Sequence, residues 1–157
     1  MKLGGLQTCS LVDYPGKVVA TVFTQGCNLR CPWCHNRELV RKRPKPEHKV
    51  EPSDFLAFLD DRKQQLDGVC VTGGEPTQHR DLEVLLLAIH SRGLQVKLDT
   101  NGTDPGTLRS LLESNLVDYV AMDLKHRLDP FSYETACGNA IDLNAIRESI
   151  GILLASK

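Results

Sequence analysis

VVATVFTQGCNLRCPWCHN, residues 18–36, joins an apolar run rich in β-branched residues to a loop that holds three cysteines. The run at 18–23 has the composition of a buried strand. Similar runs recur at 68–72, 94–100 and 118–124, and each is predicted to be a strand. The order in which these runs alternate with helical patterns therefore decides the architecture.

Helical patterns separate the predicted strands. Their start signals are residues 52–54, Asp104-Pro105 and Asp142, and Gly93 is a stop signal. The apolar positions at helical spacing are Phe55, Leu56 and Leu59; Leu82, Leu85, Leu86 and Ile89; Leu108, Leu111 and Leu112; and Leu143, Ile146, Ile150 and Leu153. This alternation predicts an α/β fold of parallel strands with crossover helices, either an open doubly wound sheet or part of a β/α barrel.

The unusual motifs all follow predicted strands. The cysteine loop (residues 25–36) follows the first strand, and Gly73-Gly74-Glu75-Pro76 follows the second. The third strand closes with residues 99–102, and the fourth with residues 123–125. Both candidate folds bind ligands at the carboxyl ends of their strands. The four motifs are therefore expected to meet in one active site.

The composition is that of an ordinary globular protein, with 41% hydrophobic residues, 25% charged residues and a formal net charge of -1. This balance argues against a dedicated nucleic-acid binder. The sequence contains neither a signal-like apolar segment nor a membrane span, so we expect a cytoplasmic protein with reduced thiols. Cys9, Cys70 and Cys137 are then expected to be small buried hydrophobic residues.

Residues 41–49 (RKRPKPEHK) are basic and contain proline, which predicts a loop. A solvated connection explains this segment. The alternative is a docking surface for an acidic partner or nucleic acid.

Cys27, Cys31 and Cys34 provide three thiolates, whereas a structural zinc site takes four ligands. His35 adjoins Cys34, and adjacent side chains are poorly placed to share one tetrahedral ion. A cubane iron-sulfur cluster held by three thiolates keeps one iron open to another ligand. The spacing favours such a cluster over zinc.

Cys-x3-Cys-x2-Cys, with Trp33 just before the last cysteine, resembles the cluster loop of the radical S-adenosylmethionine (SAM) enzymes. The resemblance implies a partial (β/α) barrel of the radical SAM type, with residues 1–157 forming one radical SAM domain. It also implies a 4Fe-4S cluster on Cys27, Cys31 and Cys34, and SAM on the open iron.

Other motifs are similar to cofactor contacts of that family. Gly73, Gly74 and Glu75 match a Gly-Gly-Glu-Pro element that contacts the methionyl group of SAM; alone, it would equally be a turn with Glu75 near a helix start. In glycyl-radical activating enzymes, the residues matching Asp99, Asp123 and Lys125 surround SAM, with a monovalent cation near the aspartates. The candidate cation contacts are Thr100 and the Met122 carbonyl. Two neighbouring aspartates would otherwise repel, although an internal Asp-Lys ion pair is the alternative.

The segment around Asp13-Tyr14-Pro15-Gly16 looks most like activators of anaerobic ribonucleotide reductase, and next like pyruvate formate-lyase activators. This resemblance implies an oxidoreductase that generates a glycyl radical on a partner enzyme and receives electrons from flavodoxin or ferredoxin. Neither a membrane nor nucleic acid is an expected partner. Many relatives continue for two more strand-helix units, so the chain is expected to be either a compact member or truncated, with its fourth strand at an open sheet edge.

Two other functions remain open from the sequence. One is a radical SAM enzyme that acts on a small molecule, such as a deazaguanine synthase. The other is a non-enzymatic iron-sulfur or zinc module.

Overall fold

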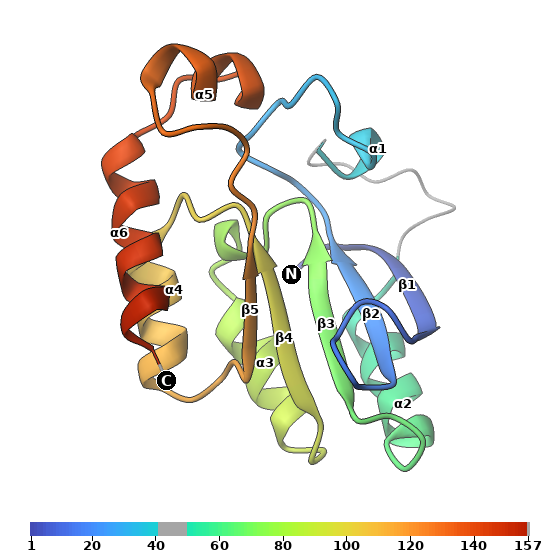
Figure 1. Ribbon diagram of the computed structural model, residues 1–157. Helices are drawn as coiled ribbons and strands as arrows, with labels where there is room; N and C mark the ends of the chain where they lie inside the picture. Colours follow the sequence, from blue (N-terminus) through green and yellow to red (C-terminus); the bar gives the residue numbers. More distant parts are fainter. Residues whose placement is uncertain (41–49, 157) are drawn as a thin grey trace.

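A computed structural model describes residues 1–40 and 50–156 of the chain, so the predicted loop at 41–49 lies outside the described residues. Its centre is a five-stranded sheet in the order β1-β2-β3-β4-β5 (Figure 1). The strands are β1 (Leu3–Ser10), β2 (Val19–Thr24), β3 (Gly68–Gly73), β4 (Gln95–Thr100) and β5 (Tyr119–Met122). Strands β2 to β5 are parallel, as predicted, and β1 is antiparallel to β2.

The four predicted helices are present. They are α2 (Pro52–Arg62), α3 (Leu82–His90), α4 (Pro105–Glu113) and α6 (Leu143–Ala155). The Asp104 and Asp142 carboxylates accept backbone hydrogen bonds at the starts of α4 and α6, whereas α2 begins without a side-chain cap. Within residues 1–40 and 50–156, three short helices accompany them: α1 (Arg37–Val40), the 3-10 helix η2 (Pro76–Gln78) and α5 (Pro130–Cys137).

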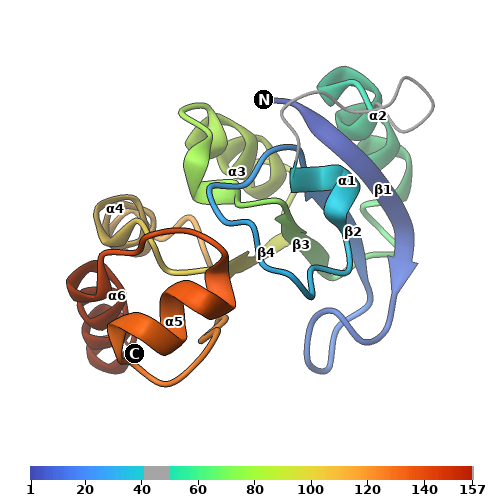
Figure 2. The ribbon, with the colours of Figure 1, turned by 90° about the horizontal axis from the view of Figure 1, so that it is seen from above.

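The main core lies between the sheet and helices α2 and α3, which cover one face of it (Figures 1 and 2). Val69 and Val71 of β3, Phe55 of α2 and Leu86 of α3 are fully buried. Burying each such side chain stabilises the fold by about 1.5–3 kcal/mol. This layer fixes the strand ends that carry the sequence motifs.

A second, smaller core joins the cysteine loop to the end of the chain. Leu29 packs there with Tyr133 and Cys137 of α5 and with Leu143 and Ile146 of α6. The side chains of Cys27, Cys31 and Met122 pack against this cluster. Helices α5 and α6 therefore support the cysteine loop from the side opposite α1.

Strand β1 and helix α5 were not predicted from the sequence. Gly4, Gly5 and three exposed positions break the alternation of β1, and its pairing with β2 is irregular between Gln7 and Ser10. The prediction that Cys9 is buried is wrong, because Cys9 lies in this irregular part of an edge strand and is exposed. Cys70 and Cys137 are buried, as predicted.

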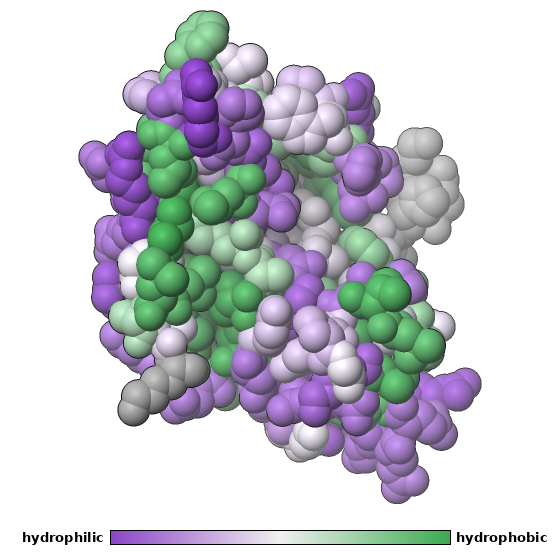
Figure 3. Space-filling model, viewed as in Figure 1, coloured by the Kyte–Doolittle hydropathy of each residue, from purple (hydrophilic) through white to green (hydrophobic). Residues whose placement is uncertain are grey.

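Strand β5 forms the other edge of the sheet in the described part of the chain. Figure 3 shows hydrophobic residues gathered over α6 and the β5 side of the molecule. Exposed residues on these elements and the segment between them include Tyr119, Leu124, Phe131 and Leu154. No helix among the described residues is long and apolar enough to span a membrane.

Candidate active site

The carboxyl ends of β2 to β5 open into one cavity of about 500 Å³. Figure 2 looks down on this edge, where the cysteine loop, α1 and α5 gather above the strands. The cavity brings together every predicted cluster and SAM residue. These are Cys27, Cys31, Cys34, Trp33, Gly73, Gly74, Glu75, Asp99, Asp123 and Lys125. The convergence expected from the sequence is therefore present.

Backbone hydrogen bonds fasten the start of the cysteine loop to the turn after β3. The Glu75 N–H donates to the Gly26 carbonyl at 2.8 Å, and the Gly74 N–H donates to the Thr24 carbonyl at 2.9 Å. The two chains lie so close that a Cβ on Gly74 would stand 2.1 Å from the Gly26 oxygen. Only glycine fits at this crossing, which explains one glycine of the motif.

The other side of the loop is fastened to the end of α5. The Arg30 N–H donates to the Cys137 carbonyl at 2.8 Å, and the Asn139 side chain donates to the Asn28 carbonyl at 2.5 Å. Gly138 ends α5 with φ of 67°, and a Cβ there would stand 2.4 Å from the Arg30 oxygen. Sequence reasoning missed these residues, although Asp129-Pro130 and Gly138 are start and stop signals for a helix.

The Asn28 side chain ties the loop to the segment after β4. Its carboxamide donates to Thr103 Oγ1 at 2.8 Å and accepts from the Asn101 carboxamide at 2.9 Å. No sequence signal identified Asn28, since a loop asparagine between two cysteines is unremarkable in composition. The cysteine loop is thus held by three separate elements.

The three cluster cysteines are half-buried. Burial raises the pKa of Cys27, against the hydrogen bond that the Leu29 N–H donates to its sulfur at 3.3 Å. Burial also raises the pKa of Cys31. Among the described residues, no three His, Cys, Asp or Glu side chains are grouped to hold a single metal ion. A cubane places a different iron on each thiolate, so the three sulfurs need only line one cavity.

Glu75 is the most deeply buried carboxylate of the site, with 1% exposure. It accepts four hydrogen bonds, from the N–H and hydroxyl of Thr77, the hydroxyl of Thr100 and the N–H of Asn101. Burial raises its pKa, and these hydrogen bonds oppose that rise. Glu75 caps η2, as the turn interpretation expected, and it also links the ends of β3 and β4.

Each aspartate of the site has a lysine two residues away. Lys125 Nζ lies 2.8 Å from Asp123 Oδ2, and Lys97 forms an ion pair with Asp99. Burial opposes the charge on both lysines, but the aspartate contacts outweigh it and leave the pKa of each lysine above its ordinary value. Lys97 was missed, although a lysine between Val96 and Leu98 in a buried strand is itself a signal.

These ion pairs correct the electrostatic argument for a monovalent cation. Asp99 and Asp123 are each compensated by a lysine, so they need no cation between them to relieve repulsion. The Thr100 hydroxyl donates to Glu75 and accepts from the Gly102 N–H, and its carbonyl accepts from the Asp123 N–H. A cation at this position stays a prediction.

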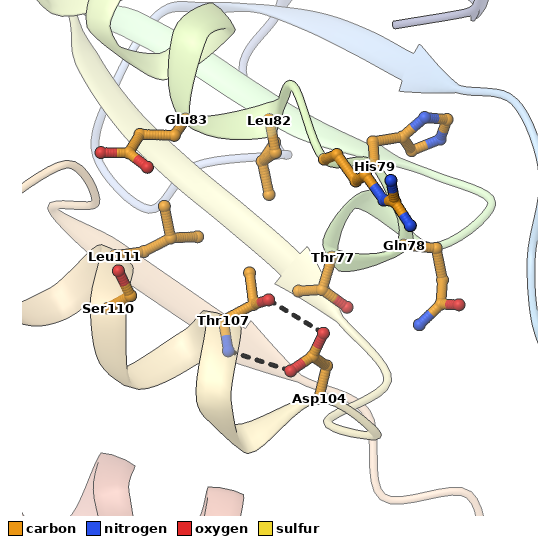
Figure 4. A pocket seen from close by; sticks show the side chains of 10 residues that line it. Thr77, Gln78, His79, Leu82, Glu83, Asp104, Thr107, Ser110 and Leu111 are labelled. Atoms are coloured by element: carbon orange, nitrogen blue, oxygen red, sulfur yellow. Dashed lines mark hydrogen bonds between the residues drawn. The ribbon is translucent and has the colours of Figure 1, made fainter.

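A second cavity, of about 310 Å³, lies between η2, α3 and α4 (Figure 4). There Asp104 accepts hydrogen bonds from the N–H and hydroxyl of Thr107 at the start of α4. The His79 ring points away from this pair in Figure 4. The lining of this cavity shares no residue with the active-site cavity.

Comparison with known proteins agrees with this site. The family model of the radical SAM superfamily matches residues 21–156. A protein named as a glycyl-radical enzyme activating enzyme, from Methanocaldococcus jannaschii, is 36% identical over 137 residues, or 86% of this chain and 55% of its own length. The 7-carboxy-7-deazaguanine synthase of Rhodospirillum rubrum is 35% identical over 135 residues, or 80% of this chain and 53% of its own length.

The fold is also found in solved structures. Streptococcus suis SuiB bound to its precursor peptide SuiA aligns with a TM-score of 0.61 and 22% identity, over 88% of this chain and 30% of that one. At this identity the likeness concerns the fold alone. The chain spans about half the length of the curated relatives described above.

Proposed function

Because the chain belongs to the radical SAM superfamily, whose members use a 4Fe-4S cluster and SAM, we propose that it is an iron-sulfur activase. The activase generates a glycyl radical on a partner enzyme, for which anaerobic ribonucleotide reductase is our first candidate. The observation that carries this proposal is the meeting of three thiols, Asp99, the Asp123-Lys125 ion pair and the Gly-Gly-Glu turn in one cavity.

The donor set fits the cluster. Cys27, Cys31 and Cys34 would hold it, and Trp33, half exposed on the same loop, lines the cavity beside them. When bound, the cluster would supply the electron for reductive cleavage of SAM, and the cleaved SAM would supply the radical that removes a hydrogen atom from the target glycine. The protein's own task is to hold SAM and to exclude water.

The structure divides the SAM contacts between backbone and side chains. The Glu75 carboxylate is fully occupied by the protein, so the backbone of Gly73 and Gly74 is the part of this turn that we assign to the SAM methionyl group. Asp123 is largely exposed to the cavity and, with Lys125, suits the charged ends of SAM. Asp99 lies on the neighbouring strand, where a carboxylate suits the ribose hydroxyls.

Access to the site favours a protein substrate. Helices α2 and α3 lie behind the sheet, and the opposite face of β3 to β5 is in view in Figure 1. Tyr14 and Tyr119 pack against each other at the amino end of that face, with ring centroids 5.5 Å apart. We expect a loop from a partner enzyme to approach the cavity along this face.

The test is an anaerobic assay. Reconstituted, dithionite-reduced protein is mixed with SAM and anaerobic ribonucleotide reductase, and EPR is used to look for a glycyl radical. Cys34→Ser is the matched inactive variant, and Arg109→Gln, on the surface of α4, is the control expected to behave as wild type. SAM cleavage without a radical on any glycyl-radical enzyme would reject the activase and keep the superfamily assignment.

A radical SAM enzyme acting on a small molecule is the second candidate, because the deazaguanine synthase relative is 35% identical over 80% of this chain. Incubation with SAM and the substrate of that synthase, followed by mass spectrometry of the products, tests it. Formation of 7-carboxy-7-deazaguanine would replace the activase proposal.

A further inference from the structure

Cys27 lines two cavities on opposite sides of the cysteine loop. One is the active-site cavity, and the other, of about 720 Å³, lies between the cysteine loop, the first residues of the chain and η2. Lys2, Arg30, Gln78 and His79 are among the residues that line this outer cavity. The outer cavity is therefore the second approach to the position that the cluster would occupy.

The two cavities differ in the charges that line them. In the described part of the chain, the lining of the active-site cavity has three carboxylates, Glu75, Asp99 and Asp123, and one lysine, Lys125. This excess of carboxylates suits a substrate with a sulfonium cation. The outer cavity contains no carboxylate among its lining residues, and it carries the exposed cations Lys2 and Arg30. The charges thus separate a face for a cationic ligand from a face for an anionic partner.

The cations of the outer cavity are not neutralised by the part of the chain that the structure describes. Neither Lys2 nor Arg30 forms an ion pair within residues 1–40 and 50–156. The Arg30 guanidinium instead donates to the carbonyls of Cys27 at 2.7 Å and Leu29 at 2.6 Å, which places its charge on the cysteine loop itself. Burial lowers the pKa of His79, so this histidine adds no charge at neutral pH.

We infer that the outer cavity docks a small acidic electron-transfer protein, which delivers the electron past Lys2 and Arg30 to the Cys27 side of the cluster. This inference rests on the proposed function, since only a redox-active site needs such a donor. With flavodoxin as donor, the flavin hydroquinone anion loses one electron and becomes the neutral semiquinone. The cluster gains that electron, its charge falling from 2+ to 1+, and no proton moves. Electron-transfer encounters bury little surface, so electrostatic steering determines their rate.

The experiment uses flavodoxin as the probe. It introduces negative charge at the rim of the outer cavity and leaves the residues of the cysteine loop unchanged. Lys2→Glu and Lys2→Glu/Gln78→Glu alter exposed side chains. Arg30 is left intact because it binds the backbone of the loop. Lys63→Glu is the control. Lys63 is also an exposed lysine, it pairs only loosely with Asp60 at 3.9 Å, and it follows α2 near the amino end of β3, away from the cysteine loop at the carboxyl ends of the strands.

Two measurements are compared at low salt and at about 0.5 M salt, where charges are screened beyond a few ångströms. One is the affinity of oxidised flavodoxin for the cluster-free protein. The other is the second-order rate at which flavodoxin hydroquinone reduces the loaded protein. At low salt we expect both to fall by about tenfold in the double variant, to fall less in Lys2→Glu and to stay unchanged in Lys63→Glu. At high salt the differences should disappear.

An unchanged affinity and rate in the double variant would overturn the inference, as would an equal loss in Lys63→Glu. Reduction by dithionite separates this failure from failure of the proposed function. All variants should cleave SAM equally with dithionite if only docking is affected. If neither the wild type nor any variant cleaves SAM with dithionite, the proposed function is rejected. The affinities for flavodoxin would still show whether the outer cavity is its docking site.

Discussion

Replacing Gly74 by alanine tests whether the crossing between the β3 turn and the cysteine loop positions the cluster ligands. The added Cβ would lie 2.1 Å from the Gly26 oxygen and 2.6 Å from its carbonyl carbon, whereas ordinary contacts begin at 3.4 Å. Both chains at the crossing are backbone, so they must separate by about 1 Å for the methyl group to fit. No flexible side chain can absorb this change.

The cost follows from the contacts at the crossing. Overpacking costs about 1–3 kcal/mol. Separation also weakens the bonds from Glu75 N–H to Gly26 and from Gly74 N–H to Thr24, each contributing about 0.5–1.5 kcal/mol. We therefore expect Gly74→Ala to lower the free energy of unfolding by about 2–6 kcal/mol, a large part of the usual 5–15 kcal/mol. Since Cys27 follows Gly26 directly, cluster loading should fall as well.

Urea unfolding of the cluster-free protein, followed by far-ultraviolet circular dichroism, measures the first effect. Iron and sulfide content after anaerobic reconstitution measures the second. Gly151→Ala is the control, because Gly151 lies in α6 with nothing within 4 Å of the added Cβ and should gain about 0.5–1 kcal/mol. A Gly74→Ala protein with wild-type stability and full iron content would refute the reasoning.

Three further predictions concern α5 and the buried thiols. Gly138→Ala should lower the free energy of unfolding in urea by about 1–3 kcal/mol more than Gly93→Ala does. Both glycines have positive φ, which disfavours alanine, but only at Gly138 would the added Cβ collide with the backbone of the cysteine loop. Equal losses in the two variants would show that α5 does not hold the loop through this contact. Burial raises the pKa of Cys70 to about 12 and of Cys137 to about 11, so iodoacetamide at pH 8, followed by mass spectrometry, should modify them about a hundredfold more slowly than exposed Cys9. Because the unfolded Cys70 thiol ionises near pH 9 and the folded one does not, its stabilising contribution is complete below pH 9 and is lost as pH rises toward 12. In denaturation at pH 9 to 11, Cys70→Ala should therefore lose about 1.4 kcal/mol less per pH unit than wild type, and parallel curves would disprove this assignment.

The sequence predicted the parts of the fold that depend on local pattern. Four buried parallel strands and their helices show clear periodicity, and their carboxyl ends place the motifs of one site together. Strand β1 could not be predicted in this way. Its glycines and exposed polar residues show no alternation, and its position depends on pairing with the edge of β2.

The sequence predicted which residues line the candidate site. It did not predict which partners their side chains contact. Glu75 was expected beside SAM, and it lines the cavity; its carboxylate accepts hydrogen bonds from Thr77, Thr100 and Asn101, which the sequence did not predict. Lys97 was overlooked because its partner, Asp99, was considered alone. Such roles depend on distances across the sheet, which one-dimensional spacing does not contain.

The three-sided attachment of the cysteine loop has a consequence for the life of the cofactor. A zinc finger is unordered until its metal arrives, so the metal must supply the free energy of folding. Here most of the chain entropy of the receptacle is already lost when the sheet and α5 form, and the incoming iron and sulfide meet preset anchors. Loss of the cluster to oxygen should therefore leave the cysteine loop folded and able to bind a new cluster. Repeated loss and reassembly of the cluster then need no unfolding of the chain.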